Sequence, residues 1–196
     1  MNILTEQLPT AVEIDDVVYD LDTDFRTCLN IILAFEDPEL TSYEKQMVML
    51  ELLYKEIPEN TREACRLGVK FLDCGEDPEA NAAQNEGPGR LYSFNQDAKY
   101  IYSAIKQSHG IDFETVDYLH WWKFSYMFLD LREDCFFHRL IHLRRQKNLG
   151  KLTKEEKELY YRIQDIVDVP EVRTTEEQIV ASEFMRLLKQ GKNEAE

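Results

Sequence analysis

Helix start signals recur along most of the chain, and they constrain its fold more than any other feature. Thr41, Thr153 and Thr174 are each followed three residues later by Glu. In such a capping box the two side chains satisfy free amides of the first helical turn. Apolar residues then recur at steps of three and four, which indicates a helix with one buried face. The sequence therefore predicts a mainly α protein.

Further helices are expected between these boxes. Their predicted N-caps are polar residues just before periodic apolar segments: Thr23, Asn60, Asn95 and Asp112. One more helix is expected over roughly residues 133–147. Two short β-branched segments flank Asp15 and Asp16 and predict a hairpin over residues 11–19. We therefore expect about seven helices in one compact domain with a small N-terminal β-hairpin.

The chain of 196 residues suits one domain with an extension. We expect a helical core domain over residues 1–149, in which residues 75–90 form a mobile loop rich in Gly, Pro, Asn and acid. Residues 150–196 are expected to form a C-terminal extension of two helices. A secretory signal pattern is missing, and no apolar run approaches the roughly 20 residues that span a bilayer. The sequence thus predicts a soluble intracellular protein.

The formal charge of −15 is unevenly distributed. Residues 1–98 carry 21 acidic and 7 basic side chains, whereas residues 99–196 carry 17 and 16. A field of this sign repels phosphate and anionic lipid, which argues against nucleic-acid and membrane binding. A basic stretch from Arg139 to Lys157, which includes Arg144, forms either a solvated face or a contact with acid. That acid is expected in the first half of this chain, of a second copy or of another partner.

The segment from Asp112 to Leu131 is predicted to form one helix with two apolar faces, roughly 150° apart on a helical wheel. One face holds Leu119, Trp122, Tyr126 and Leu129, and the other holds Phe113, Trp121, Phe124, Phe128 and Leu131. Such a helix is either sandwiched inside its own domain or offers one face to a partner. In the second case, aromatic side chains are the candidate anchors because they give large contact areas. These candidates are Trp121, Trp122, Phe124 and Phe128.

Signatures of catalysis are missing from the sequence. The seven glycines form neither a phosphate-binding loop nor a dinucleotide fingerprint, and no G-x-S-x-G elbow occurs. Asp134, His138 and His142 have the spacing of one helix face and are a candidate zinc site. The same residues also suit ordinary ion pairs on a helix surface. We therefore expect a non-enzymatic protein without a cofactor.

The last predicted helix carries Val180, Phe184 and Leu187 in one narrow apolar stripe, after a linker that contains Pro170. This stripe either docks on the core or belongs to an amphipathic arm that enters the groove of a partner. The three residues are therefore further candidates for partner binding.

Four motifs of the chain resemble those of one phage family. They are Thr23-Asp24-Phe25-Arg26, Asp97 with Ile101-Tyr102-Ser103-Ala104, Gly110-Ile111-Asp112-Phe113, and Leu119-His120-Trp121-Trp122-Lys123-Phe124. In this order the segment from Leu8 to Arg145 resembles the "gene product fifteen" family of long-tailed phages and prophages of Gram-positive bacteria. The last hexapeptide is highly specific, and no motif beyond Leu149 matches the family.

The resemblance implies a role in tail assembly, because the family is encoded between the tail tube protein and the tape-measure protein. It implies a chaperone that binds and solubilises the tape-measure protein in the host cell cytoplasm while the tube forms. The tail tube protein and a second copy of the chain are further expected partners. The alternative is a structural tail or head-tail connector component that is retained in the virion. The family has no accepted catalytic residues.

Overall fold

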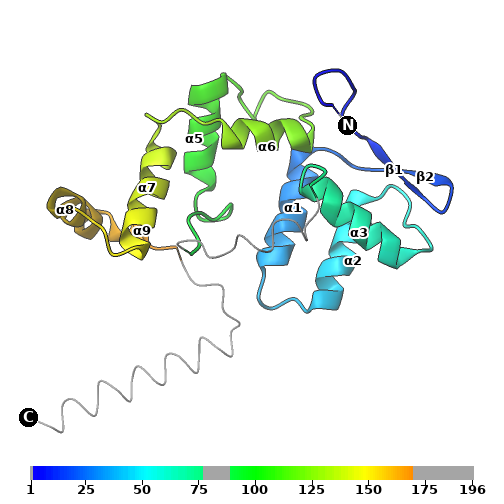
Figure 1. Ribbon diagram of the computed structural model, residues 1–196, viewed down its shortest axis with the longest axis horizontal. Helices are drawn as coiled ribbons and strands as arrows, with labels where there is room; N and C mark the ends of the chain where they lie inside the picture. Colours follow the sequence, from blue (N-terminus) through cyan, green and yellow to red (C-terminus); the bar gives the residue numbers. More distant parts are fainter. Residues whose placement is uncertain (1, 77–88, 170–196) are drawn as a thin grey trace, which may run out of the picture.

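The computed structural model describes residues 2–76 and 89–169 and is mainly helical (Figure 1). The described residues form two strands and eight helices: β1 (Ala11–Ile14), β2 (Val17–Asp20), α1 (Phe25–Glu36), α2 (Ser42–Leu53), α3 (Thr61–Leu72), α5 (Ala98–His109), α6 (Trp121–Leu129), α7 (Phe136–Asn148), α8 (Lys154–Arg162) and α9 (Gln164–Val167). The predicted mainly α fold with an N-terminal hairpin is thereby confirmed. The hairpin and α1–α3 lie at one end of the molecule, α7–α9 lie at the other, and α6 runs between them (Figure 1).

Two predicted segments lie wholly or largely outside the described residues. These are the loop over residues 75–90, of which residues 77–88 are not described, and the last helix after Thr174. Within residues 2–76 and 89–169, no helix has both the length and the apolar character needed to cross a membrane.

The N-terminal hairpin forms as the sequence predicts, with β1 and β2 antiparallel and Ile14 opposite Val17. Its two-residue turn places Asp15 at φ 50° and Asp16 at φ 62°, a left-handed conformation that matches the twist of paired strands. The hairpin lies against α3, where Nδ2 of Asn60 donates to Oδ2 of Asp15 at 2.9 Å. This contact supplies stability that two strands alone lack in water.

Local capping signals place several helix starts correctly. The capping boxes at Thr41 and Thr153 are present at the start of α2 and α8, and the predicted cap of α3 is also confirmed. The first helix differs, because Asp24 rather than Thr23 caps α1. The Thr23 hydroxyl instead lies 2.6 Å from the hydroxyl of Tyr118. Tertiary contact therefore decides between two adjacent residues that can both cap a helix.

The prediction of one helix over residues 112–131 is wrong in its first half, since α6 begins only at Trp121. The backbone before α6 pairs with the segment before α1. The amide of Phe25 donates to the carbonyl of Leu119 at 2.9 Å, and the amide of Trp121 donates to the carbonyl of Thr23 at 2.8 Å. These hydrogen bonds hold the residues before α6 extended, and they override the helical spacing of the side chains.

Besides Thr23, two further predicted N-caps are not caps. Asp112 lies in the loop before α6, where its carboxylate accepts hydrogen bonds from Lys106 and Tyr102 at 2.6 Å each. The hydrogen bond from Lys106, followed by those from Tyr102 and the amide of Glu114, lowers the pKa of Asp112 to about 2. Asn95 also lies outside a helix, because α5 begins at Ala98.

Aromatic side chains from distant parts of the chain form the centre of the core. Phe25 of α1 stacks on Phe124 of α6 at a ring-centroid distance of 5.1 Å, and Phe113 lies 4.8 Å from Phe25. Phe94 and Phe128 extend this cluster, with their centroids 5.2 Å apart. Since α6 also packs against both α1 and α5, it joins the two ends of the molecule.

Arg144 of α7 is buried, although it belongs to the predicted basic stretch. Its side chain is 2% exposed and forms a bidentate ion pair, at 2.6 and 2.9 Å, with Asp97, which is fully buried. The guanidinium also donates to the carbonyls of Leu91, Ile166 and Val167. The basic stretch is expected to form either a solvated face or a contact with acid. Arg144 agrees with the second interpretation, because its partner Asp97 belongs to the first half of the chain. This contact fixes α9 to α7 and to the start of α5, across the division predicted after residue 149.

Candidate functional site

His120, in the hexapeptide Leu119-His120-Trp121-Trp122-Lys123-Phe124, joins the N-terminal segment to α6. Its Nδ1 accepts a hydrogen bond from the amide of Trp122 at 3.1 Å, and its Nε2 lies 3.0 Å from the carbonyl of Pro9. Because a carbonyl only accepts, this arrangement places the proton of a neutral ring on Nε2. Burial lowers the pKa of His120, and the charge of Lys123 acts in the same direction.

The two tryptophans of the hexapeptide close the C-terminal end of α3. Nε1 of Trp121 donates to the carbonyl of Leu72, and Nε1 of Trp122 donates to the carbonyl of Phe71, both at 2.8 Å. The last carbonyls of a helix lack partners within it, so the indoles satisfy two of them. Gly75 completes the junction, since its φ is +89° and a Cβ there would lie 3.0 Å from the Trp122 ring.

These contacts place the candidate aromatic anchors inside the domain. Trp121 and Trp122 are each 5% exposed, and Phe124 is 1% exposed. Phe128 is half-buried, while Leu129 at the end of α6 is 80% exposed. In this conformation the three buried side chains can reach a partner only if α6 leaves the core. The other candidate anchors lie outside the described residues: Val180, Phe184 and Leu187.

The candidate zinc ligands do not come together. Asp134 precedes α7, so it does not share the helix face of His138 and His142, and its carboxylate binds Arg132 at 2.7 and 2.8 Å. Nε2 of His142 lies 3.2 Å from a carboxylate oxygen of Glu156. In the part of the chain that the structure describes, no group of three His, Cys, Asp or Glu side chains could hold a metal ion. The zinc interpretation is therefore wrong for these residues.

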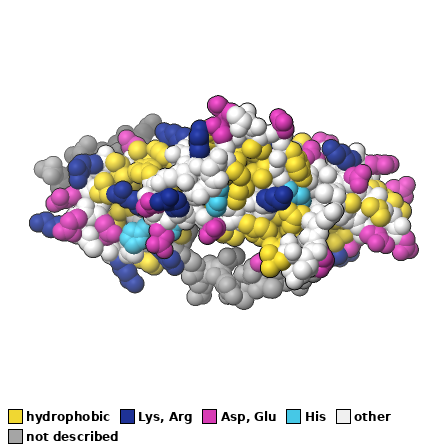
Figure 2. Space-filling model, turned by 90° about the horizontal axis from the view of Figure 1, so that it is seen from above, with side chains coloured by type: hydrophobic (Ala, Val, Ile, Leu, Met, Phe, Trp, Pro, Cys, Tyr) yellow, Lys and Arg dark blue, Asp and Glu magenta, His cyan; other side chains and the backbone are white. Residues whose placement is uncertain are grey.

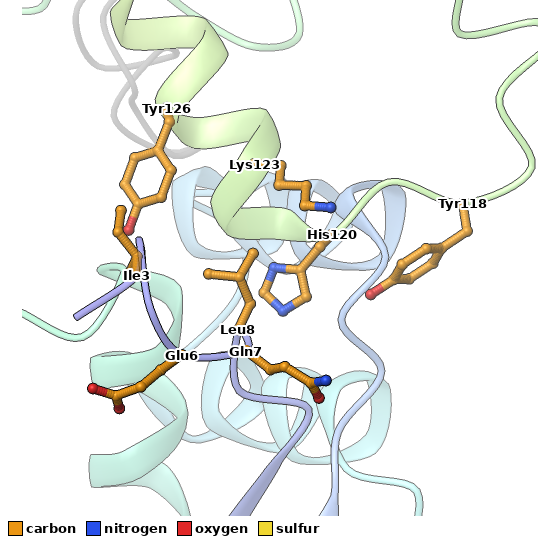
Figure 3. A pocket seen from close by; sticks show the side chains of 8 residues that line it. All are labelled: Ile3, Glu6, Gln7, Leu8, Tyr118, His120, Lys123 and Tyr126. Atoms are coloured by element: carbon orange, nitrogen blue, oxygen red, sulfur yellow. The ribbon is translucent and has the colours of Figure 1, made fainter. Parts of the chain in front are cut away.

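A cleft of about 480 Å³ lies between α6 and the N-terminal turn (Figure 3). Its lining residues come from two segments: Ile3, Glu6, Gln7, Leu8, Tyr118, His120, Lys123 and Tyr126. Ile3 and Tyr126 lie at one end of the cleft, and Tyr118 lies at the other (Figure 3). The walls are largely apolar, and the volume falls in the range of about 300–1,000 Å³ that is usual for binding pockets.

The polar groups of the cleft suit binding. Both ring nitrogens of His120 are engaged, and the carboxylate of Glu6 accepts a hydrogen bond from the amide of Asn2 at 2.9 Å. Lys123 is exposed and has no ion-pair partner among residues 2–76 and 89–169. Its ammonium points into the space between His120 and Tyr118 (Figure 3). The cleft can therefore receive an apolar side chain that is flanked by a carboxylate.

Sequence reasoning missed this cleft, although it singled out the hexapeptide that forms one wall. The opposite wall comes from residues 3–8, which have no periodic apolar pattern. Ile3 and Leu8 could have indicated this wall, because both are apolar residues in a segment without predicted secondary structure.

Fold and cleft together define a mainly helical protein with an apolar binding cleft beside its central aromatic helix. The chain belongs to the bacteriophage Gp15 protein family, whose sequence model matches residues 4–169. This match confirms the resemblance, extends it through α8 and α9, and identifies a phage structural or assembly-related protein. Comparison with curated proteins and with solved structures found no match.

Proposed function

We propose that this protein is a tail assembly chaperone. In this proposal it binds the tape-measure protein through the cleft beside α6, in the host cytoplasm, and keeps it dispersed while the tail tube forms. Family membership supports a role in phage assembly. The cleft supports the proposed binding of the tape-measure protein. Its apolar walls and the available cation at Lys123 suit an amphipathic helix that has acidic flanks.

The physical demands of the task support the same assignment. A tape measure is a long helical protein, and its apolar stripes would aggregate if they were left bare. A chain with a formal charge of −15 would keep the coated complex dispersed. Because tube subunits must displace the chaperone, each contact should be weak and many copies should bind along one tape measure. Contacts with the tail tube protein and between copies remain predictions.

Co-expression with the tape-measure protein of the same phage tests this function. The tape measure should become soluble and elute with many copies of this chain in size-exclusion chromatography with light scattering. Lys123→Glu and Ile3→Asp should each abolish co-elution, because one reverses the cation of the cleft and the other places a charge in its apolar wall. Neither side chain is buried in the core, since Lys123 is exposed and Ile3 is 44% exposed.

Two matched variants control for surface charge. Lys151→Glu makes the same charge reversal in the loop before α8, and Leu149→Asp alters a residue with a similar exposure of 46%. Both should leave co-elution unchanged. The proposal is refuted if the tape measure stays insoluble and this chain elutes alone. Recovery of the chain from purified virions in fixed stoichiometry would instead establish the alternative, a structural component.

A further inference from the structure

The outer edge of β2 presents backbone groups that are not paired. In a hairpin with a two-residue turn, the residues that flank the turn exchange both hydrogen bonds, and this role falls to Ile14 and Val17. Hydrogen-bonded and non-hydrogen-bonded pairs alternate along antiparallel strands. The N–H and C=O of Val18 therefore point away from β1. Among the described residues the sheet has two strands, so no third strand covers this edge.

The same edge already accepts a strand-like segment further along the chain. The amide of Lys55 donates to the carbonyl of Asp20 at 3.0 Å, and the amide of Asp22 donates to the carbonyl of Leu53 at 2.7 Å. The chain bends at Lys55 and Glu56, so this pairing stops before it reaches Val18. The backbone of β2 is thus in the geometry that an added strand requires.

The side chains around the open edge define the chemistry of an occupant. Val18 is 67% exposed and Val17 is 50% exposed, whereas natural sheet edges usually carry charges that deter pairing. Glu13, Asp16 and Asp20 surround these valines, are exposed, and have no ion-pair partner in the described part of the chain. Carboxylates also gather over the end of the molecule that holds the hairpin, α2 and α3 (Figure 2). An apolar edge within an acidic surface favours a strand that is both apolar and basic.

We propose that the open edge of β2 binds an extended segment of a partner protein in which apolar residues alternate with Lys or Arg. Side chains of such a strand point alternately to the two faces of the sheet. On one face its apolar residues lie beside Val17. On the other, its basic side chains lay their aliphatic stems over Val18 and direct their charges to Glu13 and Asp20. A second copy of this chain is disfavoured, because antiparallel pairing of two β2 strands would bring these carboxylates together.

A short synthetic peptide of alternating Lys and Val tests this inference on the full chain. The peptide should slow hydrogen exchange of the Val18 amide in NMR spectra, and its affinity should fall as salt is added. Val18→Pro removes the outward N–H without removing a bond to β1, and proline is tolerated at sheet edges. Val18→Thr, which keeps the amide and the β-branch, is the matched control. Val18→Pro should weaken binding by about tenfold relative to Val18→Thr, as expected when a hydrogen bond is lost.

Three outcomes would overturn the inference. They are equal binding by Val18→Pro and Val18→Thr, equal binding of a peptide of alternating Glu and Val, and protection of amides away from the hairpin. A concentration-dependent dimer that forms without peptide and is lost in Val18→Pro would assign the edge to a second copy instead. The hairpin edge and the α6 cleft involve different residues, so failure of this test leaves the chaperone proposal unaffected.

Discussion

Arg144→Met removes the donors that hold three segments of the chain together, and its effect can be worked out from the buried ion pair. Asp97 is fully buried and would keep the amide of Ser93 as its remaining donor, at 3.0 Å. Breaking a buried pair by removing one partner costs about 3–5 kcal/mol of the free energy of unfolding, because the other charge stays desolvated. The buried hydrogen bond to the carbonyl of Val167 is lost as well, whereas the carbonyls of Leu91 and Ile166 are partly accessible to water. We expect a loss of about 4 kcal/mol.

Guanidinium unfolding followed by far-ultraviolet circular dichroism measures this loss. Adding Asp97→Asn to Arg144→Met should recover about 2 kcal/mol, because the second change removes the stranded charge. Arg145→Met is the matched control on the adjacent, exposed residue, and it should lie within about 0.5 kcal/mol of the parent. An Arg144→Met variant within about 1 kcal/mol of the parent would refute the reasoning, since it would mean that Asp97 is not held desolvated.

Three further predictions concern the ends of helices, and guanidinium unfolding measures each. Asp24→Ala should cost about 1 kcal/mol, because Asp24 caps α1 through the amide of Arg26 at 2.9 Å, and Asp24→Asn should retain most of the stability. Trp122→Phe should cost about 1 kcal/mol, because the carbonyl of Phe71 loses the indole donor but keeps the amide of Cys74 at 3.1 Å. Stability should decrease below about pH 6.5, because burial lowers the pKa of His120 and the unfolded chain then binds more protons than the folded one. His120→Asn can still cap but does not titrate, so it should flatten this pH profile.

Each of these predictions has a contradicting result. Equal loss in Asp24→Ala and Asp24→Asn would show that the cap does not account for the effect. An unchanged midpoint in Trp122→Phe would mean that water replaces the indole donor. A pH profile as steep in His120→Asn as in the parent would assign the acid sensitivity to another group.

Local signals were sufficient where a helix start depends on residues within one turn. The capping boxes at Thr41 and Thr153 satisfy their own amides, so no distant contact is needed to place α2 and α8. The start of α6 could not be predicted in this way, because Leu119 pairs with Phe25, which is distant in sequence. Side-chain periodicity cannot reveal that the preceding backbone is held in an extended conformation.

Sequence reasoning could predict one wall of the cleft, which the hexapeptide forms, but not the other wall. The hexapeptide is recognisable in the sequence, and its tryptophans predict candidate anchors, but composition does not show that their N–H groups meet the end of α3. Arg144 illustrates the same limit: its spacing from Phe137 and Leu140 places it on the apolar face of α7, but the sequence does not reveal which carboxylate it meets. Only the fold brings Asp97 within hydrogen-bonding distance of Arg144.

The indole contacts with α3 also have a spectroscopic consequence. The chain contains two tryptophans, and both lie at the junction of α3 and α6. Intrinsic fluorescence excited selectively at tryptophan therefore reports on this one junction, without contributions from α7 to α9. Because Lys123 and Tyr126 of the cleft belong to the same short helix, a ligand that shifts α6 would change the emission without any added label.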